Sequence, residues 1–284
     1  MSTEAAVFQG LSWNPLTDLH RLLSFHFMVN ALEAGTAVAV MAGAIGWFMV
    51  LRRQTFAGHT LAVIAFPGAA GAALAGIPLA FGYFGACAAG ALALGGVSAD
   101  RTGSLDRESA ATGTVQAIGL GLGFLFVVLY HGLLSGISAL LFGTFLGIDD
   151  NQVLTLVVVA VASLVLLAVA GRPLLFASLD REVAEAAGVP VRALSLGFLL
   201  VLGLAVAATS QITGALLVFA LLVAPPAAAQ RLTARPLRGL LLSVAIGVVV
   251  TWVGLALAYF SIYPAGFYIT SLAFGIYLVA RIVH

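Results

Sequence analysis

Three polar side chains at helical spacing interrupt the first long apolar stretch of the chain. They are His26, Asn30 and Glu33, at positions i, i+4 and i+7, so an α-helix would carry them on one face. Imidazole and carboxylate groups together bind zinc or manganese, and imidazole alone favours zinc. Because an ionisable side chain inside an apolar helix is costly, this face predicts a metal contact. A structural alternative for Glu33 is a hydrogen bond to a neighbouring helix.

A second candidate ligand, His59, lies near the start of the next apolar stretch. It fits either a metal ligand or a histidine at a membrane surface. If both helices are straight, His26 and His59 lie near opposite ends of them, up to a membrane thickness apart. One shared site is therefore not expected, whereas successive sites along a pathway fit both positions.

The composition predicts the elements that must position these residues. Of 284 residues, 62% are hydrophobic and 8% charged, which excludes a soluble domain. The formal net charge of +1 gives no reason to expect nucleic-acid binding. The single cysteine, Cys87, cannot form an internal disulfide. We expect an all-α, polytopic membrane helix bundle at 25–284, preceded by an external N-terminal segment at 1–24 without a cleavable signal.

Nine apolar stretches are candidates for crossing a bilayer, which requires about 20 residues each. They are 25–51, 60–76, 79–97, 110–130, 152–171, 194–209, 212–230, 239–260 and 265–283. The region 76–97 fits either two short spans or a broken helix, because Gly76, Pro78, Gly82 and Gly85 interrupt it. The segment 131–151 reads as an external loop that includes His131.

The basic residues predict the orientation of these spans. All twelve are arginines, and eleven of them fall in five gaps that alternate along the chain. Arginine is retained preferentially in cytoplasmic loops, so these gaps are assigned to the cytoplasm. The chain is then a multi-pass inner or plasma membrane protein with its N-terminus outside and its C-terminus in the cytoplasm. Arg21 is the one exception.

One short helix outside the membrane is predicted at 178–190. Ser178 or Asp180 can cap its N-terminus, where the helix dipole also favours Glu182. Gly188 can adopt a left-handed terminal conformation, and Pro190 prevents continuation. The helix presents the apolar residues Val183, Ala184 and Ala187 with the acidic residues Glu182 and Glu185 around them. It is either a connecting helix on the membrane surface or a docking helix that transmits a partner's movement.

This helix resembles the coupling helix of ATP-binding-cassette (ABC) importer permeases, in the family that transports zinc, manganese or iron. Three further segments resemble the same family: 46–58 at the end of the first span, 139–147 in the external loop and 211–225 in the seventh span. The resemblance runs from about residue 25 to the C-terminus. It implies that Asp180, Glu182, Val183, Glu185, Ala187 and Gly188 contact an ATPase subunit.

The resemblance also implies a metal site after the first span, where the family pattern is Gly-Asp-x-x-x-His. This chain reads Gly58-His59-Thr60-Leu61-Ala62-Val63, so an imidazole replaces the aspartate and a valine replaces the histidine. His26, Asn30 and Glu33 could compensate. In a two-fold dimer, two copies of His59 could face each other.

The expected function is therefore a permease subunit, with no covalent catalysis and no permanently bound cofactor. The chain has no lysine and no phosphate-binding loop, so ATP hydrolysis requires a separate subunit. The resemblance further implies a second permease copy and an external metal-binding protein. Two alternatives remain: a permease for a metal chelate such as a siderophore or haem, and an ATP-independent secondary transporter, for which Glu33 is the one acidic candidate well inside a span.

Overall fold

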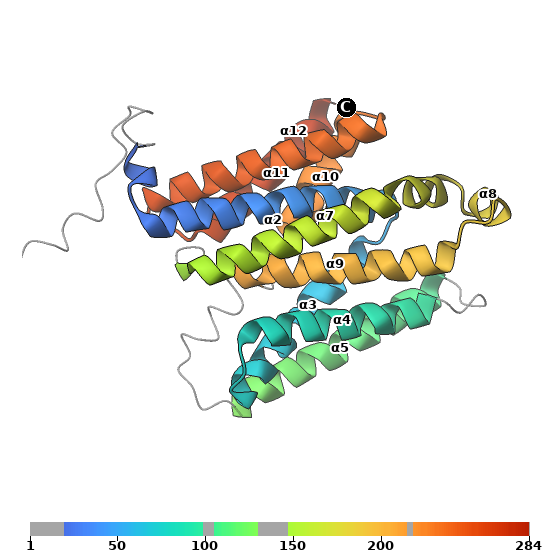
Figure 1. Ribbon diagram of the computed structural model, residues 1–284, viewed down its shortest axis with the longest axis horizontal. Coiled ribbons are helices and arrows are strands. Elements are labelled where there is room, and N and C mark those ends of the chain that lie inside the picture. The colour runs from blue at the N-terminus through green and yellow to red at the C-terminus, as the bar shows by residue number, and fades with distance from the viewer. Residues whose placement is uncertain (1–19, 99–104, 130–146, 215–217, 284) are drawn as a thin grey trace, which may run out of the picture.

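A computed structural model describes residues 20–98, 105–129, 147–214 and 218–283. Within these ranges the regular secondary structure is helical, and most of the helices run along one axis (Figure 1). The elements that position the candidate residues are α2 (His26–Leu51), α3 (Thr55–Ala75), α4 (Leu79–Ser98), α5 (Leu105–Leu129), α7 (Asp150–Leu179), α8 (Arg181–Ala186), α9 (Val191–Thr213), α10 (Val218–Leu232), α11 (Pro236–Tyr259) and α12 (Ala265–Val283).

Eight of these helices are long and apolar enough to cross a bilayer. The prediction of a polytopic helical bundle is confirmed. The region 76–97 holds neither two short spans nor a broken helix, because α4 continues without a break through Gly82 and Gly85. Of the predicted span at 212–230, the structure describes α10 from Val218 to Leu232, which is 15 residues, while α9 continues to Thr213 and ends at Gly214. The described part of α10 is about 22 Å long, less than the roughly 30 Å hydrocarbon layer.

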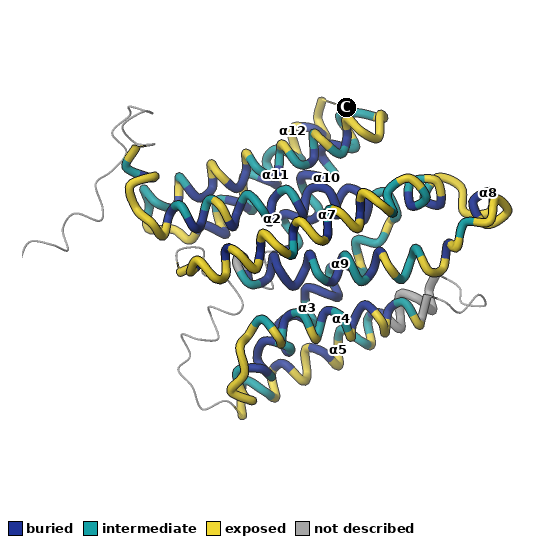
Figure 2. Tube along the Cα trace, in the orientation of Figure 1, coloured by how far each residue is buried: buried dark blue, intermediate teal, exposed yellow. Residues whose placement is uncertain are grey.

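The central helix is α2, which packs against α7, α9, α10 and α11. Small residues permit this packing: a methyl group added at Gly43 would lie 2.8 Å from the Cα of Val244 on α11. The hydroxyl of Ser243 donates to the carbonyl of Gly43 at 2.7 Å. In lipid there is no hydrophobic driving force between helices, so they associate through van der Waals packing and hydrogen bonds, and glycine permits the close approach that both require. Buried positions accordingly concentrate where helices meet (Figure 2).

The helices α3, α4 and α5 form a second group, and α9 joins them to the α2 group (Figure 1). Gly68 of α3 and Gly82 of α4 lie so close that a methyl group on either would collide with the other's carbonyl oxygen. Between these helices the chain turns at Gly76, with φ of 70°, before Pro78.

The longest helix, α7, begins with a capping box in which Asp149 accepts from the N–H of Gln152 at 2.7 Å. The cap satisfies a backbone N–H that would otherwise have no partner at the start of the helix. Its 30 residues extend over about 45 Å, which exceeds the hydrocarbon thickness. Residues 151–171 alone are long enough to cross, and α7 continues past them to Leu179, one residue before α8 begins.

Candidate functional site

His59 lies in the first turns of α3 at its junction with α2 and α10. Its imidazole packs edge-on against Phe219 of α10, with ring centroids 5.2 Å apart and planes inclined by 70°. The preceding residue, Gly58, is buried against Met49 of α2, where an added methyl group would collide with the methionine sulfur. The side chain of His59 is half-buried. His59 is therefore held among three helices, and one side of it remains accessible.

Val63 follows one turn later on the same face of α3 and is also half-buried. Thr60 points elsewhere: it is buried, its hydroxyl donates to the carbonyl of Phe56 at 3.0 Å, and the hydroxyl oxygen lies 3.5 Å from Oε1 of Gln116 on α5. The partly open face of α3 thus carries one imidazole and one valine. It offers a single metal-binding side chain per chain.

A backbone break separates α9 from α10 next to the aromatic neighbour of His59. Gly214 takes φ of 73° and ψ of 160°, a conformation reserved for glycine, and its N–H donates to the carbonyl of Ser210 at 3.0 Å. The Ser210 hydroxyl is buried without a hydrogen-bond partner among the described residues. The side-chain amide of Gln211 donates to the carbonyl of Ala207 at 3.4 Å. Interrupted helices of this kind are where transporters commonly build substrate sites.

At the N-terminal end of α2, His26 and Asn30 share one carboxylate of α7. Oδ1 of Asp150 lies 2.9 Å from His26 Nε2 and accepts from Asn30 Nδ2 at 2.7 Å. Asn30 is buried and also donates to the carbonyl of Ile148 at 3.2 Å. The sequence indicates Asp150 only as a residue near a helix start, because its partners lie more than a hundred positions away. The structure adds a contact that fastens α2 to α7.

Glu33 does not join this cluster. Its side chain is exposed, whereas Asn30, one turn earlier, is buried against α7. Across the part of the chain that the structure describes, no three His, Cys, Asp or Glu side chains lie close enough to hold one metal ion. The metal roles of His26, Asn30, Glu33 and His59 therefore stay predictions. His131 and most of the 1–24 segment lie outside the described residues.

The predicted short helix is α8, which projects at one end of the bundle between α7 and α9 (Figure 1). Asp180 is its cap, because its carboxylate accepts from the N–H of Val183 at 3.0 Å. Glu182 lies in the first turn, and Gly188 ends the segment with φ of 82°. The predicted cap at Asp180 and stop at Gly188 are confirmed, whereas Ser178 belongs to α7 and α8 has six residues, fewer than the predicted range 178–190.

The apolar residues of α8 have two different environments. Ala184 is fully buried against the ends of α7 and α9. Val183 is 51% exposed, and Ala187 is exposed beside it. Glu185 accepts from Nε of Arg181 at 3.1 Å. One side of α8 thus fixes it to the bundle, and the other presents an apolar and charged surface (Figure 2).

Arg52 connects the end of α2 to the helices on either side of α8. Its guanidinium donates to the hydroxyls of Ser178 and Ser195 at 3.2 and 2.8 Å, and to the side-chain oxygen of Gln54 at 3.3 Å. The guanidinium carbon also lies 5.5 Å from the ring centre of Phe198. The sequence indicates Arg52 only as a topology marker, since its partners on α7 and α9 are remote in the chain.

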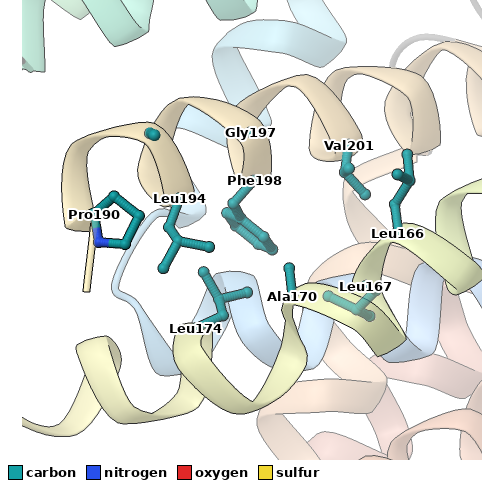
Figure 3. A pocket seen from close by; sticks show the side chains of 10 residues that line it. Leu166, Leu167, Ala170, Leu174, Pro190, Leu194, Gly197, Phe198 and Val201 are labelled. Atoms are coloured by element: carbon teal, nitrogen blue, oxygen red, sulfur yellow. The ribbon is translucent and has the colours of Figure 1, made fainter. Parts of the chain in front are cut away.

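A crevice of about 230 Å³ lies between α7 and α9. Figure 3 shows Leu174 of α7 and Leu194 and Phe198 of α9 pointing into it. Its lining side chains are all apolar, so this crevice offers no metal ligand.

A profile of the ABC 3 transport family matches residues 24–284. Three curated relatives are similar over most of their length. The manganese import system permease protein ScaB of Streptococcus parasanguinis is 28% identical, over 84% of both chains. The manganese transport system membrane protein MntC of Halalkalibacterium halodurans is 30% identical, over 85% of this chain and 81% of the relative. The chelated iron transport system membrane protein YfeC of Yersinia pestis is 30% identical, over 86% and 80%.

Two solved structures have the same arrangement of helices. PsaBC from Streptococcus pneumoniae, in complex with Fab, superposes with a TM-score of 0.83 at 26% identity, over 93% of this chain and 94% of that one. An inward-facing conformation of a putative metal-chelate type ABC transporter superposes with a TM-score of 0.71 over 96% and 92%. Its identity of 19% supports the fold alone.

Proposed function

The chain belongs to the ABC 3 transport family, and we propose that it is the membrane-spanning permease subunit of an ATP-driven importer of divalent metal ions. One structural observation carries the mechanism. The helix α8 is capped at both ends, is anchored through buried Ala184 and presents Val183 and Glu185 outward. A separate ATPase subunit binds this surface.

The connections of α8 explain how movement reaches the membrane. It follows α7 after one residue and precedes α9 by a short turn, so a displacement of α8 pulls on both helices. The bonds from Arg52 to Ser178 and Ser195 couple the same displacement to the end of α2. ATP binding and hydrolysis in the partner thereby bias the bundle between states open to either side.

The transported ion contacts His59. The half-buried imidazole is the one metal-binding side chain at the family position, and Val63 cannot contribute. A second copy of the permease supplies its own His59, so that two imidazoles meet across the dimer axis. The relatives named above support manganese or iron as cargo, and imidazole also suits zinc.

The other end of the bundle receives the ion. His26 and Glu33 are exposed on α2 there, and the hydrogen bond from Asn30 to Asp150 joins α2 to α7 beside them. An external metal-binding protein delivers the ion to this side. The arginine-rich gaps support an orientation with the N-terminus outside and with α8 and the C-terminus in the cytoplasm.

Reconstitution tests this proposal. The full chain is co-expressed with a candidate ATPase subunit from the same genome, purified and placed in proteoliposomes loaded with a metal-sensitive dye. We expect ATP-dependent entry of Mn²⁺ or Fe²⁺ that requires the delivery protein. Ion-gradient-driven flux by the chain without an ATPase would instead support a secondary transporter. Transport of a ferric chelate but not the free ions would support the chelate alternative, which the name of the Yersinia pestis relative brings into consideration.

A further inference from the structure

A polar pocket of about 430 Å³ opens beneath α8, apart from His59 and from the outward surface of α8. Its walls are the turn between α2 and α3, the ends of α4 and α7, the start of α8 and the first turns of α9. The charged side chains that line it are four arginines, Arg52, Arg53, Arg181 and Arg192, and no lining residue among those described is an aspartate or glutamate.

Most of this positive charge has no carboxylate partner among the described residues. Arg181 has a carboxylate partner, Glu185. Among the described residues, Arg52, Arg53 and Arg192 form no ion pair with a carboxylate. Burial lowers the pKa of Arg52, and the nearby charge of Arg181 lowers it further, although an arginine still stays protonated at neutral pH. An anion in the pocket would relieve this repulsion.

The backbone at Arg53 gives an independent indication. Arg53 has φ of 57° and is the one non-glycine residue with positive φ in the described chain. It ends α2 in a Schellman motif, in which Arg53 N–H bonds to Val50 O at 3.1 Å and Gln54 N–H bonds to Met49 O at 2.9 Å. Glycine is the usual residue at this position, and an arginine costs on the order of 1 kcal/mol there. Such an outlier motivates a functional hypothesis for the arginine side chain.

Arg52 is already held in a fixed orientation. Three of its N–H groups bond to Gln54, Ser178 and Ser195. Its guanidinium carbon lies over the ring of Phe198, 5.5 Å from the ring centre. A guanidinium has five N–H donors, so two remain for a ligand. A preorganised guanidinium loses little conformational freedom when it binds an oxyanion, and several together match the acceptor oxygens of a phosphate.

We propose that this pocket binds a phosphate group, carried either by the headgroup of an anionic phospholipid or by a soluble phosphate. Phe198 lies between the pocket and the apolar crevice of Figure 3, because its ring stacks on Arg52 and also lines the crevice. A lipid source is therefore included in the test. The inference rests on the arginines alone and does not depend on the importer function.

The experiment uses the full chain and two arms that separate the sources. In the first arm, nanodiscs of neutral phosphatidylcholine are titrated with inorganic phosphate, and the unfolding temperature is compared with that in chloride at equal ionic strength. In the second arm, native mass spectrometry counts phosphatidylglycerol and phosphatidylcholine molecules retained from a mixed bilayer. A response in the first arm identifies soluble phosphate, and preferential retention of phosphatidylglycerol identifies the headgroup.

Two pocket variants and one matched control complete the design. Arg53→Gly removes a charge and relieves the backbone, so it can lower anion binding without loss of stability. Arg192→Ala removes a charge in the first turn of α9, and Arg238→Ala is its control, because Arg238 is also exposed in the first turn of a helix but lies outside the pocket. We expect each pocket variant to weaken binding by about tenfold, the effect of one charged hydrogen bond, and the control to leave it unchanged.

Three results would overturn the proposal. One is that neither arm responds. Another is that phosphate and chloride act equally on all variants, which would indicate general screening. The third is that the pocket variants lose a co-purifying ATPase while anion binding is unchanged, which would make the arginines a protein-binding surface.

Discussion

The imidazole of His59 and the ring of Phe219 meet edge-on across the boundary between α3 and α10, with centroids 5.2 Å apart. Phe219 is the second residue of α10 as the structure describes it, and α9 ends before it at Gly214. The contact therefore joins His59, at the family metal position, to α10, the helix that follows the break at Gly214. Movement of α10 relative to α3 would therefore change the surroundings of the imidazole.

His59→Ala is expected to reduce metal uptake by an order of magnitude or more. It removes the one metal-binding group on the open face of α3, and loss even of groups that orient a ligand costs about 10–100-fold in affinity. Uptake of Mn²⁺ into proteoliposomes measures the effect, and His59→Phe keeps a ring against Phe219 without offering a ligand. If His59→Phe transports normally, His59 has only a packing role.

Val63→His is expected to increase metal affinity. It places a second imidazole one turn from His59 on the same face, a spacing at which two side chains can hold one ion. Isothermal titration with Zn²⁺ and Mn²⁺ checks this, and Thr60→His is the control because Thr60 is buried against α5. Equal affinities for wild type and Val63→His would show that this face does not bind the ion.

Glu185→Arg is expected to uncouple ATP hydrolysis from transport, since it reverses a charge on the outward surface of α8. The substitution also breaks the contact with Arg181. The double variant Arg181→Glu with Glu185→Arg restores an oppositely charged pair in α8 while the surface stays altered. ATPase and uptake rates are measured together. Full recovery in the double variant would assign the effect to the intrahelical pair rather than to docking.

Asn30→Ala is expected to destabilise the protein by about 1–3 kcal/mol, because it removes the buried link from α2 to Asp150 and to the carbonyl of Ile148. Thermal unfolding in detergent measures the change. Asn151→Ala is the control, since Asn151 is exposed in the first turn of α7. Similar unfolding temperatures for the two variants would argue against a structural role for the cluster.

Gly43→Ala is expected to destabilise the bundle by about 1–3 kcal/mol, the usual cost of overpacking. The added methyl group would lie 2.8 Å from Val244 Cα, and backbone atoms cannot move away easily. Gly121→Ala in α5 is the control, because no described atom lies within 4 Å of its new methyl group. It should be neutral or slightly stabilising, and equal losses of unfolding temperature for both would contradict the close-approach argument.

The sequence was sufficient for features that depend on local chemistry. Apolar length predicts the membrane helices, because lipid cannot satisfy an open backbone. The order Asp180, Glu182, Gly188 and Pro190 predicts the bounds of α8, because each residue acts within one turn of itself. Similarly, comparison of residues 58–63 with the family pattern shows that Val63 occupies the histidine position, and this requires no structure.

Only the tertiary structure decided which polar residues meet. His26 and Asn30 share Asp150 of α7, whereas Glu33, at the predicted spacing, lies exposed away from them. The burial of Arg52 and the grouping of four arginines beneath α8 likewise depend on how α2, α7 and α9 converge. Helical periodicity determines which side chains share a face, but the packing of remote helices determines what that face contacts, and no local pattern encodes that packing.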